Sequence, residues 1–137
     1  MIKAIIPMKG HNERLPGKNT IDLCGKPLFA YLLKTLLETK IEQVTVDTDN
    51  PEIAEAVKKI FPEILIDFRP AEYCGDFVGG NKLLSRFVTE PEDIYVQSHV
   101  TCPLIKARSI DKAIEMIESG VSSVFSVTKI NQRLWMN

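Results

Sequence analysis

The chain has 137 residues, which fits one domain, since domains commonly hold about 100 to 200 residues. Apolar residues make up 45% and charged residues 26%, a globular balance that excludes a disordered chain. The net charge is -1, so no overall field favours nucleic acid or an anionic membrane. No apolar run approaches the roughly 18 residues of a membrane span, and the first apolar stretch is too short for a signal peptide. We therefore expect one soluble, cytoplasmic domain over residues 1–137.

The cysteines are three in number and widely spaced, at Cys24, Cys74 and Cys102. An odd number argues against a disulfide framework, and a zinc site would need paired cysteines two residues apart. The spacing predicts reduced thiols that fill gaps.

Strand and helix patterns alternate along the chain. An apolar run predicts a first strand at 2–7, and leucines at helical spacing predict a helix within 27–39. A second strand is expected at 43–47, followed by a helix that Asn50 caps. The remaining expected elements, in chain order, are a strand at 64–67, a helix around 83–88, a strand at 94–97, a helix capped by Ser109 and ended by Gly120, and a fifth strand at 122–128.

This alternation predicts parallel βαβ units and an α/β fold. The expected architecture is a three-layer α/β/α sandwich around a mostly parallel, Rossmann-like sheet. Ligands bind such sheets at the carboxyl ends of the strands, where the strand order reverses. The loops that follow the strands are therefore the place to look for function.

The first of these loops, residues 8–27, is unusually long and carries a concentration of cations: Lys9, His11, Arg14 and Lys18. Gly10 and Gly17 permit a close backbone approach or a positive φ. A basic, glycine-punctuated loop after a parallel strand is typical of phosphate binding, and a merely solvated basic loop is the alternative. The spacing excludes a Walker loop, because six residues separate Gly10 from Gly17 and Asn19 follows the lysine.

The same loop resembles a known signature. Its Leu15-Pro16-Gly17-Lys18-Asn19 stretch is similar to the Leu-Pro-x-Lys-Asn motif of the cytidylyltransferases that activate sialic and related sugar acids. These enzymes are a branch of the nucleotide-diphospho-sugar transferase superfamily. Weaker matches follow in the family's order, at 25–28, 48–54, 69–76 and 101–104, so that the resemblance covers nearly the whole chain. The resemblance implies the sheet type of that superfamily.

The chain also departs from the family pattern. Met8-Lys9 stands where Ala-Arg is usual, and Cys102 stands where the family has serine. The residues that flank Asp76 replace a run rich in serine and threonine. Because lysine offers a point charge rather than a bidentate fork, the exchange at Lys9 alters the expected phosphate geometry.

The resemblance implies a set of residues for the nucleotide. Lys9 and Lys18 are expected to grip the CTP triphosphate and to act in catalysis by offsetting charge on the departing pyrophosphate. The other implied nucleotide-binding residues are Gly10, Asn19, Arg69 and Asp76. Two of these have structural alternatives: Asn19 as a side chain that closes the loop, and Arg69 as a surface ion pair with Glu72 or Asp76.

His99 and Thr101 follow the fourth strand, and the resemblance implies that they bind the substrate. It places His99 beside the sugar or the nucleotide, and Thr101 would cap or shape the same loop. A hydrogen-bonded structural role is the alternative for His99, which replaces the usual glutamine. Asp47 and Asp49 form a candidate metal pair, but Asp49 precedes Asn50-Pro51 and fits the start of a helix better. The resemblance implies Mg2+ as cofactor, with ligating aspartates in a C-terminal part beyond residue 137.

The implied activity is transfer of CMP from CTP to a sialic acid-like sugar acid, with release of pyrophosphate. CTP and the sugar acid are the expected partners, without nucleic acid or membrane, and a homodimer is expected for the full-length form. Two alternatives stay open. One is a sibling nucleotidyltransferase that uses a sugar phosphate, and the other is a non-catalytic nucleotide-binding fragment.

Overall fold

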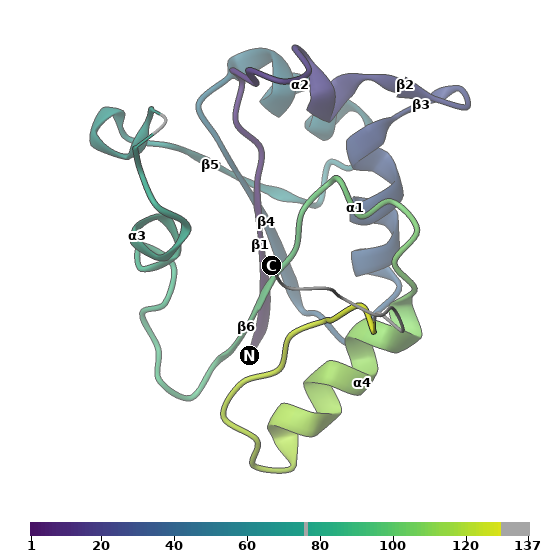
Figure 1. The fold of residues 1–137 in the computed structure, drawn as a ribbon, viewed down its shortest axis with the longest axis vertical. Coiled ribbons are helices and arrows are strands. Elements are labelled where there is room, and N and C mark those ends of the chain that lie inside the picture. The colour runs from purple at the N-terminus through teal and green to yellow at the C-terminus, as the bar shows by residue number, and fades with distance from the viewer. Residues whose placement is uncertain (76, 130–137) are drawn as a thin grey trace, which may run out of the picture.

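A four-stranded parallel sheet forms the centre of the computed structural model, which describes residues 1–75 and 77–129 (Figure 1). Its strands are β1 (Ile2–Pro7), β4 (Gln43–Thr48), β5 (Leu65–Phe68) and β6 (Ile94–Gln97). They lie in the order β5-β4-β1-β6, and every neighbouring pair is parallel. The chain thus runs outward from β1 to β5 and then returns to the other side of β1. The order reverses between β1 and β6, which is where such sheets place a ligand crevice.

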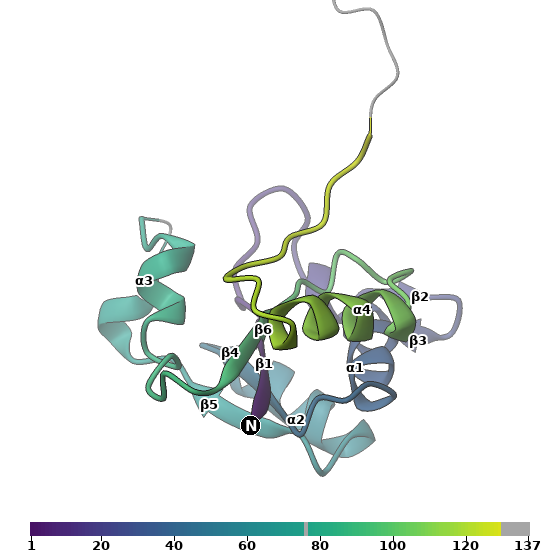
Figure 2. The same ribbon diagram turned by 90° about the horizontal axis from the view of Figure 1, so that it is seen from below.

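Helices cover both faces of this sheet. Figure 2 shows α1 (Leu28–Leu37), α2 (Pro51–Ile60) and α4 (Ala107–Glu118) on one side and the short α3 (Gly80–Leu84) on the other. The predicted α/β sandwich with a mostly parallel sheet is therefore confirmed. In the part of the chain that the structure describes, no helix is long and apolar enough to cross a membrane.

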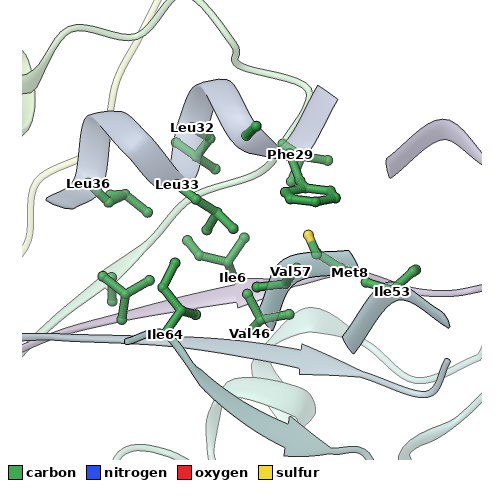
Figure 3. Packing of buried hydrophobic residues seen from close by; sticks show 14 of the residues in the cluster. Ile6, Met8, Phe29, Leu32, Leu33, Leu36, Val46, Ile53, Val57 and Ile64 are labelled. Atoms are coloured by element: carbon green, nitrogen blue, oxygen red, sulfur yellow. The ribbon is translucent and has the colours of Figure 1, made fainter. Parts of the chain in front are cut away.

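The core lies between the sheet and the three helices on its first face. Ala4 and Ile6 alternate along β1 toward this side, as period-two alternation requires, and Met8 continues their row. Phe29 and Leu33 of α1 lie over Met8 and Ile6 (Figure 3). The largest fully buried apolar side chains are Phe29, Ile6, Met8, Leu32, Leu33, Leu36, Ile64, Ile114, Val46 and Val57.

The connection from β1 to α1 has internal structure of its own. It contains a 3-10 turn, η1 (Lys18–Thr20), and a hairpin of β2 (Asp22–Leu23) and β3 (Lys26–Pro27). Cys24 and Gly25 form the hairpin turn with φ of 53° and 83°, the left-handed pair that a two-residue hairpin favours. About a third of the long predicted loop is thus regular structure.

Helix boundaries match the sequence signals at some ends and not at others. Asn50 caps α2 as predicted, since its Oδ1 accepts the N–H groups of Glu52 and Ile53. Ser109 was the wrong cap for α4, because the helix begins at Ala107 after Lys106 and Ser109 lies inside the first turn. The third helix is shorter than expected and ends at Leu84.

The strand expected at 122–128 is wrong. Residues 121–129 form no strand, and Phe125 and Val127 are exposed. A strand exists only through hydrogen bonds to a neighbouring strand. No described segment pairs with this stretch, so its alternating apolar pattern finds no partner in the described part of the chain.

A buried ion-pair network lies on the second face of the sheet, the face that α3 covers. The carboxylate of Asp47, at the end of β4, is fully buried and accepts Nη2 of Arg69 at 2.6 Å and Nη1 of Arg86 at 3.0 Å. Arg86 also pairs with Asp67 of β5, and its guanidinium lies 5.1 Å from the centre of the Tyr73 ring. Two carboxylates therefore balance two guanidinium groups.

We expect Asp47→Ala to destabilise the fold by about 3–5 kcal/mol, because it leaves the buried Arg69 without a counter-charge. Urea unfolding measures the loss. Asp67→Ala is the matched control, since Asp67 is partly exposed and Arg86 keeps Asp47, so we expect a loss of about 1 kcal/mol or less. Equal losses in the two variants would contradict a network centred on Asp47.

Candidate functional site

A cleft opens at the carboxyl ends of β1 and β6, where the strand order reverses. Its volume is about 200 Å³. It brings together five of the residues predicted from the sequence: Lys9, Lys18, Asn19, His99 and Thr101. Pro7, Asn12 and Val100 complete the lining. The first loop and the loop after β6 thus form opposite walls of one cleft.

The cleft suits an anion. Its described lining includes two lysines and no carboxylate. Lys18 is half-buried and makes no ion pair with any residue that the structure describes. The other loop cations, His11 and Arg14, are exposed and lie outside the lining. Within this loop, Lys9 and Lys18 are therefore the residues that present positive charge to a ligand in the cleft.

Asn19 closes the loop as well as lining the cleft. Its side chain is buried, and its Nδ2 donates to the Lys9 carbonyl at 2.8 Å. The predicted alternative of a loop-closing side chain is therefore real, and it coexists with a place in the cleft wall. Asn12, which the sequence analysis missed, donates to the same carbonyl at 3.1 Å. It stands in a polar stretch without periodicity, so no sequence signal marked it.

Gly10 is a glycine for a steric reason. A Cβ atom at this position would lie 2.7 Å from Cβ of Asn50, closer than real Cβ contacts. Its N–H donates to Oδ1 of Asp49 at 2.6 Å. The loop therefore presses against the start of α2, and contact between Gly10 and a nucleotide stays a prediction.

The loop after β6 supplies the other wall. His99 is exposed, and its Nε2 lies 3.5 Å from Nε2 of Gln97. Its carbonyl accepts the N–H of Cys102 at 2.9 Å, which turns the chain so that Thr101 also lines the cleft. Contact of His99 and Thr101 with a substrate stays a prediction.

Arg69 lies outside the cleft lining. Its side chain is buried against Asp47 rather than paired at the surface with Glu72. The register of β4 and β5 sets Asp47 beside Asp67 at the ends of adjacent strands, which no local pattern in the sequence reveals. Asp76 lies outside the described residues, so its predicted role stays a prediction.

Both aspartates of the candidate metal pair have other partners. Asp47 is neutralised by two arginines, and Asp49 accepts the Gly10 N–H beside the start of α2. Within residues 1–75 and 77–129, no group of three or more His, Cys, Asp or Glu side chains could hold a metal ion. The three cysteines are free thiols.

Comparison with known proteins finds a family model, cytidylyltransferase, that matches residues 3–134. A CMP-N,N'-diacetyllegionaminic acid synthase from Legionella pneumophila is 44% identical over 95% of this chain and 59% of its own length. A 3-deoxy-manno-octulosonate cytidylyltransferase from Lawsonia intracellularis is 28% identical over 97% of this chain and 51% of its own. The chain therefore spans about half the length of these curated relatives.

Solved structures share the fold. A CMP:2-keto-3-deoxy-manno-octonic acid synthetase complexed with CTP superimposes with a TM-score of 0.74 and 22% identity. The match covers 87% of this chain and 48% of the other. Rv0371C from Mycobacterium tuberculosis, in complex with manganese, has a TM-score of 0.62 and 10% identity over 86% of this chain and 60% of the other.

We expect Lys18→Ala to weaken binding of tripolyphosphate by about 10- to 150-fold, because one charge-assisted contact of about 1.5–3 kcal/mol is lost. Calorimetry measures the affinity. Lys112→Ala removes the same charge from an exposed position of α4 and should bind like the unchanged protein. Equal weakening in both variants would mean that overall charge, rather than the cleft, attracts the anion.

Proposed function

The chain belongs to the cytidylyltransferase family, and on that premise we propose that it forms the CTP-binding half of an enzyme that makes a CMP-sugar. The proposed reaction transfers CMP from CTP to a sugar acid of eight or nine carbons and releases pyrophosphate. The observation that carries this proposal is the cleft at the strand-order reversal, with Lys9, Lys18 and Asn19 on one wall. The relatives' names supply the substrate class.

The proposed reaction requires the protein to position the two substrates and to neutralise the negative charge of the phosphates. A hydroxyl of the sugar acid attacks the α-phosphorus of CTP, a new P–O bond forms, and the bond to the β-phosphate oxygen breaks. Negative charge gathers on the departing pyrophosphate, and two fixed cations offset it without reorganising. Lys18 and Lys9 are the proposed cations. His99 and Thr101 would face the sugar acid from the opposite wall.

Arg69 and Asp76 belong to the proposal in different ways. The side chain of Arg69 is 5% exposed, so we assign it to holding the end of β4 beneath the loop rather than to contact with the nucleotide. We retain Asp76 as a nucleotide-binding candidate on the resemblance alone.

We propose Mg2+ as the cofactor of the whole enzyme. The described residues do not fit it, because none of their His, Cys, Asp and Glu side chains form a group of three or more that could hold a metal ion. We assign its ligands to the C-terminal aspartates that the family resemblance implies. We also propose a homodimeric, cytoplasmic enzyme that binds no nucleic acid, which agrees with the net charge of -1.

We expect CTP to bind this chain about tenfold more tightly than ATP or GTP, a difference of about 1.4 kcal/mol, because backbone and short side chains of the first loop select the base. The thermal shift at matched nucleotide concentrations ranks the three. Equal shifts for all three would support generic phosphate binding instead of cytidine recognition.

Pyrophosphate release decides between the proposed enzyme and its alternatives. With CTP and an eight- or nine-carbon sugar acid, a longer form of the protein should release pyrophosphate, and Lys9→Ala should slow it by about 100-fold or more, as loss of an electrostatic group does. Release only with a sugar phosphate would identify a sibling transferase. CTP binding without release from any acceptor would identify a non-catalytic module.

A further inference from the structure

The last residues of β4 hold the first loop through three consecutive contacts. The carbonyl of Asp47 accepts the N–H of Met8 at 2.8 Å. The hydroxyl of Thr48 donates to the carbonyl of Met8 at 2.7 Å. The carboxylate of Asp49 accepts the N–H of Gly10 at 2.6 Å. These contacts fix the backbone on both sides of one residue, Lys9.

The side chains of Thr48 and Asp49 are themselves held in place by their surroundings. Thr48 is fully buried, and its hydroxyl also accepts the N–H of Asn50 at 3.2 Å. Asp49 stands just before the cap of α2, where a negative charge is stabilised by the helix N-terminus. A carboxylate that accepts a backbone N–H forms a short, charge-assisted bond. Thr48 and Asp49 are therefore a fixed support for the loop.

The other side of Lys9 is held from within the loop. Asn19 and Asn12 both donate to its carbonyl, at 2.8 and 3.1 Å. The backbone from Met8 to Gly10 is thus bonded from two directions, and Lys9 is one of the residues that line the cleft. The direction in which the Lys9 side chain leaves the backbone is therefore fixed.

We propose that Thr48 and Asp49 are positioning residues that aim Lys9 into the cleft, and that the carboxylate of Asp49 serves as a backbone acceptor rather than a metal ligand. The effect on CTP rests on the proposed function, whereas the effect on the loop backbone does not. Replacing Asp49 by asparagine distinguishes the two roles. The amide oxygen of asparagine can still accept the Gly10 N–H, but it carries no negative charge for a metal ion.

The test compares Asp49→Ala with Asp49→Asn. In Asp49→Ala, the Gly10 amide should exchange its hydrogen about tenfold faster by NMR, while amides of the core β1–β4 pair keep their rates. Calorimetry should show CTP binding weakened by about tenfold. Asp49→Asn should restore both the slow exchange and the affinity to within about threefold of the unchanged protein, since its amide oxygen accepts the same N–H. Thr48→Val should also weaken CTP binding, and Thr48→Ser should restore it.

Glu52→Ala is the matched control, because it removes a carboxylate from the first turn of α2 without touching the loop. It should leave Gly10 exchange and CTP affinity unchanged. Unaltered Gly10 exchange in Asp49→Ala would overturn the inference, and so would an Asp49→Asn variant that binds as poorly as Asp49→Ala. If the unchanged protein fails to bind CTP, the proposed function fails, while the exchange rates still decide the positioning role.

Discussion

The fully buried carboxylate of Asp47 is the constraint on which the second face of the sheet depends. An unpaired charge at this position would destabilise the fold by several kcal/mol. Arg69 and Arg86 both pair with it. Arg69 follows β5 and Arg86 follows α3, and one side chain at the end of β4 thereby ties two later segments to the sheet. Asp67 completes the charge balance by accepting the second nitrogen of Arg86.

The same strand end controls the first loop. Asp47 binds the arginines through its side chain and Met8 through its carbonyl, and the next two residues bind the loop through their side chains. The residue that forms the ion pairs is therefore followed directly in the chain by the two residues that hold the loop. Arg69 lies outside the cleft, but its partner Asp47 also accepts the N–H of Met8, the residue before Lys9.

Most strands and the cleft could be predicted from the sequence, and the reasons for the misses are specific. Apolar runs marked β1 and β6 to the residue, because buried parallel strands have few polar positions. The cleft followed from the strand-order reversal and the cations of one loop. The partner of Arg69 depended on register between strands, which only the fold supplies. The stretch at 122–128 has the alternation of a strand but no described neighbour, and alternation alone cannot provide one.

The hydrogen bonds that hold Met8, Lys9 and Gly10 are made by other groups of the chain itself. The cost in conformational entropy of ordering this backbone therefore falls on folding. Ligand binding does not have to order the same backbone again. The loop is preorganised. Association with a ligand then needs little backbone rearrangement, as in the docking of a charged group onto a rigid surface. The association rate should fall as the salt concentration rises, because salt screens the two lysines.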